Sequence, residues 1–403
     1  MILPGHAKIE TLLRVCFALL AIPALLSAQG ASRHGPRLIV ISVAGLDQRF
    51  LNEPASRLKI PAIRRLMRQG VMAGGVLGVA PSETWPSAVA MMTGVPPALE
   101  SEATPLWQAA SANGLKTAAV YWPGTAGAAI DFDLPPADEG RGGEDIPFDG
   151  VARRAEPAGI ADRIEKTSPG FEKTLWNDAS ALTASLYALR VAKPDLLLVE
   201  FTDVDAEQRA TRTLSVYARE MMEDDDERIG QIVAAAGPDA VVALVSGHGL
   251  EDDDYVVRPR VLVKGPVDVE DGLIGTGDRA VADRLRALLK DGRKHGLARE
   301  VPMAEVRAKA PSITNWVAAF DTPANVVASE EEKGPPLGPG GHRAVSGLWP
   351  DRPGYRSVFI LAGKGIPARK IGEIDLLQIA PTLAGVLGVE LPQAKAKSLW
   401  PVR

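Results

Sequence analysis

The feature that most constrains the fold is an alternation along the chain between short apolar runs and longer segments with helical periodicity. Near-continuous apolar runs rich in β-branched residues are typical of strands buried on both faces of a parallel sheet. The sequence predicts six such strands: "RLIVISV" (37–43), "GGVLGV" (74–79), "KTAAVYW" (116–122), "DLLLVEF" (195–201), "AVVALVS" (240–246) and "SVFILA" (357–362). The periodic segments between them predict helices on both faces, so the expected fold class is α/β with a mainly parallel central sheet.

Two stretches interrupt this alternation. Residues 124–175 are rich in Gly, Pro and acidic side chains and predict a long surface excursion. Residues 250–341 contain a strand-like "YVVRPRVLVKG", a helical "DRAVADRLRALLKDG" and a Gly-Pro loop, which together predict a cap lobe inserted before the last strand of the sheet. The expected organisation is therefore an α/β core made of residues 31–249 and 342–403, with a cap lobe at 250–341.

The first 30 residues are typical of an export signal. Lys8 and Arg14 precede or border the apolar run "VCFALLAIPALL", and the small-residue stretch "SAQGAS" offers a cleavage site. The run is short of the roughly 20 residues that span a bilayer, so a cleaved signal is favoured over an uncleaved anchor. We therefore expect an exported protein, periplasmic or extracellular, with no stable membrane span after cleavage.

Cysteine content and charge exclude several classes of function. The single cysteine, Cys16, lies inside the predicted signal, so the mature chain would have no thiol for disulfides, metal binding or catalysis. The formal net charge of −5, with both signs interspersed along the chain, gives no basic surface for nucleic acid or anionic lipid. Nucleic-acid binding is not predicted.

Polar and ionisable residues recur after the predicted strands. In an open α/β sheet the ligand site lies at the carboxyl ends of the strands. The residues that follow the strands stand in "SVAGLDQ", "APSETWPS", "EFTDVDAEQR", "VSGHGLEDDD" and "GPGGHRAVSG". The sequence therefore predicts a site at this edge of the sheet.

At these residues the chain resembles the type I phosphodiesterase/nucleotide pyrophosphatase branch of the alkaline phosphatase superfamily. Five stretches in family order carry the resemblance: "LIVISVAGLDQRFLN" with "IPAIRRLMRQGVMAGGV", "APSETWPSAVAMMTGVPP", "ATPLWQAASANGLKTAAVYWPG", "KPDLLLVEFTDVDAEQR" with "VSGHGL", and "GGHRAVSG" with "IGEIDLLQIAPTLAGVLGVELP". The resemblance implies a hydrolase in which two metal ions, usually zinc, activate a threonine or serine nucleophile and clamp the oxygens of a phosphoryl transfer.

Carried onto this sequence, the family pattern is only partly present. Thr84 matches the nucleophile, and the metal ligands are matched by Asp205, His248 and His342. Taken alone, Thr84 also fits the N-cap of a helix that begins at Trp85 and Pro86.

Three ligand positions depart from the pattern. Ala44 stands where the family has an Asp, Arg209 where it has a His, and Gly247 where it has a second Asp; Ser87 replaces a common Asn. Zinc affinity falls steeply as anionic ligands are lost, and a guanidinium repels a divalent ion. The nearby carboxylates that are candidate replacements are Asp47, Asp203 and Glu251.

Three functions remain open. The favoured hypothesis is a degraded two-metal site, without a cofactor, in which Arg209 replaces a metal's charge and binds a small anion such as a phosphate or sulfate ester with little or no hydrolysis. The alternative is an active phosphodiesterase with two zinc ions and Thr84 as nucleophile. The third is an envelope scaffold whose cap lobe binds a protein partner of unknown identity.

Overall fold

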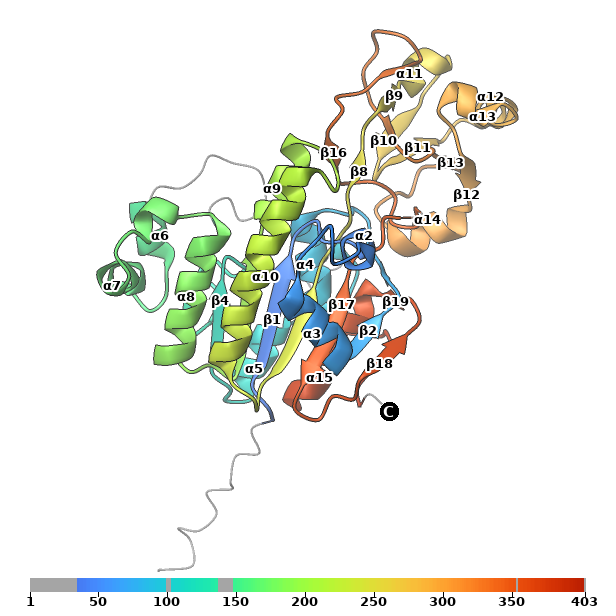
Figure 1. Cartoon of the computed structure of the whole chain (residues 1–403). Coiled ribbons are helices and arrows are strands. Elements are labelled where there is room, and N and C mark those ends of the chain that lie inside the picture. The colour runs from blue at the N-terminus through green and yellow to red at the C-terminus, as the bar shows by residue number, and fades with distance from the viewer. Residues whose placement is uncertain (1–34, 99–102, 137–147, 353, 402–403) are drawn as a thin grey trace, which may run out of the picture. The chain divides into compact units, whose positions relative to one another are not determined.

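A central eight-stranded sheet is formed largely from the apolar runs of the sequence (Figure 1). This computed structural model describes residues 35–98, 103–136, 148–352 and 354–401, so the predicted signal at residues 1–30 lies outside the described residues. The strands lie in the order β18 (Arg369–Ile371), β2 (Val71–Ala73), β17 (Phe359–Gly363), β7 (Val241–Val245), β1 (Leu38–Val43), β6 (Leu196–Phe201), β4 (Thr117–Val120) and β5 (Phe132–Leu134). Only β17 runs antiparallel to its neighbours, which confirms a mainly parallel α/β fold.

The central strands are apolar on both faces because both faces are covered. All six residues of β1 are buried, and its side chains alternate between two hydrophobic clusters. Ile39, Ile41 and Val43 face one cluster, and Leu38 and Val40 face the other. A strand without a solvent-facing side has no reason to alternate polar with apolar residues.

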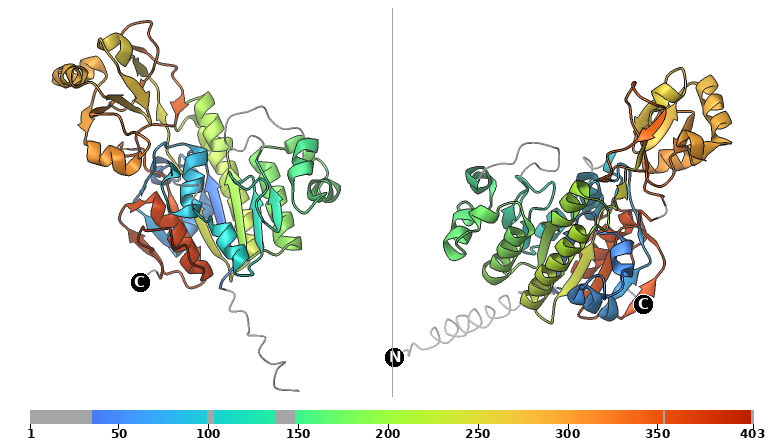
Figure 2. Two further views of the ribbon diagram at one scale, coloured as in Figure 1. Left: turned by 180° about the vertical axis from the view of Figure 1, so that it is seen from behind. Right: turned by 45° about the horizontal axis from the view of Figure 1, so that its top comes forward.

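Helices cover the two faces of the sheet (Figure 2). One face is covered by elements of the first cluster: α2 (Gln48–Asn52), α3 (Pro61–Gln69), α6 (Phe148–Arg154), α7 (Ile160–Thr167), α8 (Asp178–Val191), α9 (Asp203–Ala210) and α10 (Val216–Ala236), with η2 (Glu172–Thr174) between α7 and α8 in the chain. The opposite face is covered by α4 (Thr84–Thr93), α5 (Leu106–Ala112), η3 (Leu376–Gln378) and α15 (Ile379–Leu387). Two short strands, β3 (Val76–Leu77) and β19 (Ile374–Asp375), pair beside this core.

Residues 250–341 contain two further sheets and four helices. The four-stranded sheet has the order β10 (Asp268–Glu270), β11 (Leu273–Thr276), β13 (Ala318–Asp321), β12 (Arg299–Val301), and the three-stranded sheet has the order β14 (Val326–Ala328), β9 (Tyr255–Val257), β15 (Leu337–Pro339). The helices are α11 (Pro259–Leu262), α12 (Arg279–Leu289), α13 (Gly292–His295) and α14 (Met303–Lys309). At the start of the 250–341 region, β8 (Glu251–Asp252) pairs with β16 (Ala344–Val345), which lies just after the region ends.

The region has its own hydrophobic cluster, which includes Ile274, Val281, Leu285 and Phe320. A second cluster joins it to the α/β core, because Trp349 packs with Trp316 and other side chains of the 250–341 region. We propose that residues 250–341, with this separate hydrophobic cluster, form the expected cap lobe.

Three details of the core differ from the sequence-based expectations. The stretch at 124–175 is more than a surface excursion, because it supplies edge strand β5 and helices α6 and α7, which bury Val151 and Ile164. The stretch expected as one sheet strand at 74–79 forms only the two-residue β3, while the strand in the central sheet is the earlier β2. Gly74 and Gly75 separate the two, and Gly75 has a φ of +154° that other residues rarely adopt. Edge strand β18 has no apolar run to reveal it.

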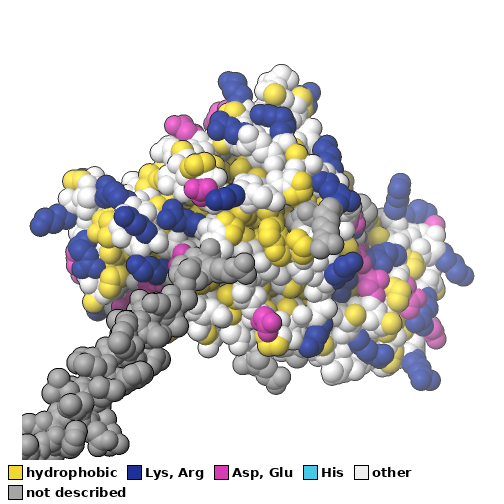
Figure 3. Space-filling model, turned by 90° about the horizontal axis from the view of Figure 1, so that it is seen from below, with side chains coloured by type: hydrophobic (Ala, Val, Ile, Leu, Met, Phe, Trp, Pro, Cys, Tyr) yellow, Lys and Arg dark blue, Asp and Glu magenta, His cyan; other side chains and the backbone are white. Residues whose placement is uncertain are grey.

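The edge of the sheet where the parallel strands begin is seen from below in Figure 3. On this face lysine and arginine side chains are spread around a partly hydrophobic centre, with acidic side chains among them. The charges are thus mixed in space as they are along the chain.

Asp226 of α10 caps helix α3 across the core. Its two carboxylate oxygens accept hydrogen bonds from the backbone N–H groups of Ile63 (2.7 Å) and Ala62 (2.9 Å). The N-cap residue of α3, Ile60, has no side chain that could do this. The carboxylate of Asp226 therefore satisfies two N–H groups that α3 leaves unpaired.

We predict that Asp226→Ala lowers the free energy of unfolding by about 1–3 kcal/mol, because two N–H groups lose their acceptor. Urea denaturation measures this. The matched control is Asp224→Ala on the same helix, whose side chain is 57% exposed and lies 3.8 Å from Arg228. An equal decrease in the free energy of unfolding in the two variants would contradict the capping role of Asp226.

Glu200 is a buried acid in the middle of the sheet. It lies opposite Ser42 in the β1–β6 pairing and is only 3% exposed. Its Oε2 atom has no hydrogen-bond partner among the described residues. Burial raises the pKa of Glu200 to about 8, so the folded protein holds this side chain neutral at physiological pH.

The pKa of Glu200 is near 4.5 in the unfolded chain, so between pH 4.5 and 8 the unfolded chain loses a proton that the folded protein keeps. The contribution of Glu200 to stability is therefore complete below pH 4.5 and is lost as the pH rises towards 8. Glu200→Gln keeps a neutral side chain at every pH. We predict that the free energy of unfolding of the variant, relative to the natural protein, increases by about 1 kcal/mol or more between pH 5 and pH 8.5. Urea denaturation of both proteins at both pH values checks this. A difference in the free energy of unfolding that does not change with pH would contradict the conclusion that Glu200 is neutral in the folded protein.

Candidate functional site

Four of the residues singled out in the sequence come together at the carboxyl edge of the sheet. Thr84 is the first residue of α4, Asp205 and Arg209 lie one turn apart on α9 directly after β6, and His248 follows β7. Because β6 and β7 both pair in parallel with β1, the segments that follow them emerge at the same edge.

Thr84 hydrogen-bonds to His248 and does not cap its own helix. The N-cap of α4 is Glu83, and it makes no side-chain capping bond. The Oγ1 atom of Thr84 lies 3.1 Å from Nε2 of His248, while Nδ1 of the same ring lies 3.0 Å from the carbonyl oxygen of Gly249. A carbonyl only accepts, so Nδ1 carries the proton and Nε2 accepts from the Thr84 hydroxyl.

His248 is held neutral by its surroundings. The side chain is 1% exposed, and this burial lowers its pKa below the usual value, although the charge of Asp205 opposes the shift. Nε2 of His248 lies 4.0 Å from Oδ1 of Asp205. The imidazole is thus a hydrogen-bond acceptor for Thr84 rather than a cation.

Asp205 is paired with Arg209. The Nε and Nη2 atoms of Arg209 donate to Oδ2 (2.5 Å) and Oδ1 (3.3 Å) of Asp205, so both carboxylate oxygens are used. Nη2 also donates to Oγ of Ser346 at 2.6 Å. Burial lowers the pKa of Arg209, but the charge of Asp205 and the hydrogen bonds to it raise the pKa above its usual value, so the guanidinium stays protonated.

One nitrogen of the Arg209 guanidinium, Nη1, is unused. The side chain is 39% exposed, and within the described part of the chain Nη1 makes no hydrogen bond. The two N–H donors of Nη1 therefore remain for a ligand.

The position before His248 has no room for a carboxylate. A Cβ atom built on Gly247 would lie 2.4 Å from Cβ of Ser87 in α4. An Asp at this position would thus require α4 to move. Ala44, at the end of β1, is 2% exposed and brings no polar side chain.

The three candidate replacement carboxylates make their contacts elsewhere. Asp47 is the N-cap of α2 and forms an ion pair with Arg49, its Oδ2 lying 2.6 Å from Nη2. Asp203 accepts a hydrogen bond from the backbone N–H of Asp178 at 3.1 Å. Glu251 pairs with buried Arg352 at 3.1 Å.

His342 also pairs outside this group. Its ring is largely exposed, and Nδ1 lies 3.5 Å from Oδ1 of Asp254, which in turn pairs with Arg212. Four residues later, Ser346 makes the contact with Arg209 that sequence reasoning missed. A serine in a loop gave no signal, because only the fold shows that its hydroxyl meets α9.

The residues present do not fit a zinc centre of the kind that the family resemblance implies. Within the described ranges, no group of three or more His, Cys, Asp or Glu side chains is placed to hold a metal ion. Asp205 and His248 are two donors of suitable chemistry, but zinc takes four ligands, or three with one open position. Arg209 adds a fixed positive charge next to Asp205.

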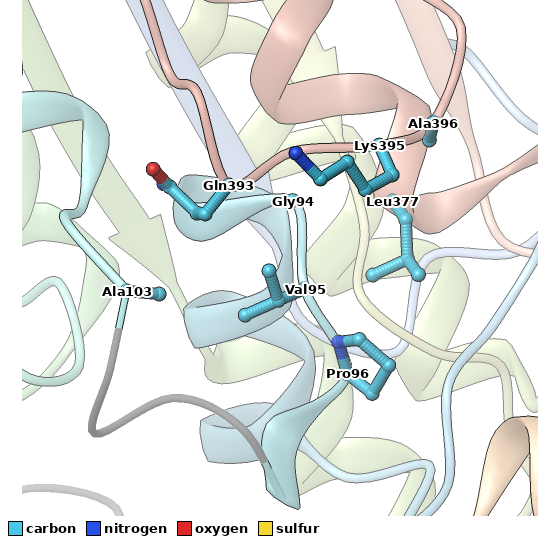
Figure 4. Close-up of a pocket in the computed structure, with 8 residues that line it drawn as sticks. All are labelled: Gly94, Val95, Pro96, Ala103, Leu377, Gln393, Lys395 and Ala396. Carbon is cyan, nitrogen blue, oxygen red and sulfur yellow. The ribbon is translucent and has the colours of Figure 1, made fainter.

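A pocket of about 380 Å³ lies at the far end of α4 (Figure 4). Gly94, Val95, Pro96, Leu377 and other residues line it, and none of the candidate site residues is among them. Val95, Pro96 and Leu377 give it an apolar wall. The polar residues near Thr84, Asp205 and His248 lie outside this pocket.

No helix within the described residues is long and apolar enough to cross a membrane.

Comparison with solved structures shows the same fold. Murine ectonucleotide pyrophosphatase/phosphodiesterase 5, as an inactive threonine-to-alanine variant in complex with AMP, is 14% identical with a TM-score of 0.62, covering 91% of this chain and 98% of that one. The human protein of the same name is also 14% identical, with a TM-score of 0.61, covering 90% of this chain and 97% of that one. No curated protein matches the chain at a significant level.

The family model described as type I phosphodiesterase / nucleotide pyrophosphatase matches residues 38–100 and 99–332. The match covers well over half of the chain and includes Thr84, Asp205, Arg209 and His248. The chain therefore belongs to the type I phosphodiesterase/nucleotide pyrophosphatase family, within the alkaline phosphatase superfamily.

Proposed function

We propose that this family member binds a small phosphate or sulfate ester at a metal-free site and hydrolyses it slowly or not at all. The observation that carries the proposal is the position of Arg209, whose guanidinium is paired with Asp205 where the family pattern has a metal ligand. A protonated guanidinium supplies positive charge permanently, and Nη1 keeps two N–H groups that can bond an anionic oxygen.

Two groups can donate hydrogen bonds to such an anion. Nη1 of Arg209 has two unused N–H donors, and the hydroxyl of Ser346, which accepts from Nη2 of Arg209, can donate its own proton. The backbone N–H groups of the first turn of α4 add a favourable field for negative charge, because α4 begins at Thr84. AMP in the murine neighbour supports a phosphate monoester as the ligand class.

Slow or absent hydrolysis follows from the chemistry of Thr84. Without a metal ion to lower its pKa, a threonine hydroxyl is a weak nucleophile. The apolar N-terminal segment supports the further proposal that the protein acts after export.

Neither alternative is favoured by a specific observation. An active two-zinc enzyme needs carboxylates from Asp47, Asp203 or Glu251, and all three are engaged elsewhere. A scaffold would be supported by a contiguous apolar patch on the 250–341 region, where Tyr255 and Val317 are the exposed large hydrophobic side chains.

We predict that Arg209→Met weakens binding of AMP or inorganic phosphate by about ten-fold or more, because charge-assisted hydrogen bonds to the anion are lost. Isothermal titration calorimetry in the presence of EDTA measures this. The matched control is Arg212→Met, which removes an arginine of equal exposure that pairs with Asp252 and Asp254. Equal affinity of the Arg209→Met variant and the natural protein would contradict the proposal.

A further inference from the structure

The 250–341 region contains a pocket of about 410 Å³ on its three-stranded sheet. Each strand of that sheet contributes one residue to the wall, and the others come from α13 and from the turn between β13 and β14. The residues that line the pocket are Tyr255, Arg293, Pro323, Ala324, Val326 and Leu337. None of them belongs to the group around Thr84 and Arg209, so the pocket is a second candidate site.

The turn before β14 gives the pocket a wall that is fixed before any ligand binds. The backbone N–H of Val326 donates to the carbonyl oxygen of Pro323 at 3.1 Å, and the hydroxyl of Thr322 donates to the carbonyl oxygen of Val326 at 2.5 Å. Arg352, which is 2% exposed, donates from Nη2 to the same Pro323 carbonyl at 2.5 Å. A wall held in this way loses little conformational freedom when a ligand binds.

Helix α13 brings the positive charge of Arg293 to this wall. The chain turns directly after the helix at Gly296, which has a φ of +70°. A Cβ atom on Gly296 would lie 2.9 Å from Cβ of Val257 in β9 and 3.1 Å from Cδ1 of Leu337 in β15. The end of α13 therefore packs closely on the sheet, and Arg293 lies at the pocket.

The polar and aromatic groups of the pocket are not used by the protein itself. Arg293 is exposed and has no hydrogen bond or ion pair in the part of the chain that the structure describes, whereas Arg258 of the same region is paired with Glu331. Tyr255 is 53% exposed, and there its side chain makes no hydrogen bond or ring contact either. The pocket thus combines an uncompensated positive charge, an open aromatic ring and an apolar wall.

We propose that this pocket binds a small organic acid that has an aromatic body and one carboxylate. The carboxylate pairs with the guanidinium of Arg293, and the ring packs against Tyr255 and the apolar wall. Charge complementarity favours an anion, because Arg293 is the charged member of the lining and has no acidic partner among the described residues. The inference is independent of the function proposed for the Arg209 site.

The size of the pocket favours a small molecule over a protein partner. Its volume lies within the range of roughly 300–1,000 Å³ that is usual for small-molecule sites. Tyr255 and Val317 are the exposed large hydrophobic side chains described in the region. Two such side chains are far fewer than the roughly 20–30 residues that each partner contributes to a stable protein interface.

Three probes separate the contributions of the ring and the charge. 4-Phenylbutyrate has both, 4-phenylbutanol has the ring without the charge, and butyrate has the charge without the ring. Ligand-observed NMR titration of the purified protein should show 4-phenylbutyrate binding about three- to five-fold more tightly than 4-phenylbutanol, the gain from one solvent-accessible ion pair. It should bind about ten-fold or more tightly than butyrate, because butyrate buries no ring.

Variants of the lining should change these affinities selectively. Arg293→Gln should bring 4-phenylbutyrate down to the affinity of 4-phenylbutanol, and Tyr255→Ala should weaken both. The matched control is Lys294→Gln, which removes the next positive charge on α13; Lys294 is 77% exposed and lies outside the lining. This control should keep the preference for the acid.

Three results would overturn the inference. One is that 4-phenylbutyrate does not bind at about 10 mM, and another is that 4-phenylbutanol binds as tightly as the acid. The third is that Lys395→Gln, in the pocket at the far end of α4, or Arg209→Met weakens binding of 4-phenylbutyrate while Arg293→Gln does not. Failure of the proposed function would be seen separately, in the titration with AMP.

Discussion

The ion pair between Asp205 and Arg209 determines what this site can do. The two residues are one helical turn apart on α9, the spacing at which side chains meet, and both carboxylate oxygens of Asp205 are occupied by the guanidinium. A carboxylate used in this way is not open to a metal ion, and arginine cannot lose its proton to make room. The family fold is retained, and under our proposal Arg209 supplies a permanent positive charge where the family pattern has a metal ligand.

The surrounding fold holds this pair in place. The N-cap of α9, Thr202, makes no side-chain capping bond; instead the buried carboxylate of Asp178 accepts from the backbone N–H groups of Thr202 (2.8 Å) and Asp203 (2.9 Å). Further along α9, Gln208 donates to the carbonyl oxygen of Gly45 at the end of β1. The helix that carries Asp205 and Arg209 is thereby tied to α8 and to the central strand, so the donors of Arg209 are oriented before a ligand arrives.

The fold could be predicted from the sequence because strands that are buried on both faces appear as apolar runs. The group of Thr84, Asp205 and His248 could be predicted because each residue follows a strand or begins a helix at the same edge of the sheet. The sequence could not predict where nearby acids point. Asp47 is three residues from Ala44, yet the turn into α2 makes it a helix cap paired with Arg49. Ser346 reaches Arg209 only through the packing of distant segments, and no local sequence pattern predicts such a contact.

If Arg209 takes the place of a metal ion, as we propose, the purified protein should contain little or no metal. Protein purified without chelators would be analysed by inductively coupled plasma mass spectrometry, with hydrolysis of bis-p-nitrophenyl phosphate measured with and without added zinc. We predict well under one equivalent of metal per chain and no turnover that depends on Thr84. About two equivalents of zinc, with activity abolished by Thr84→Ala, would contradict the account, because two ions are what the hydrolytic members of the superfamily use.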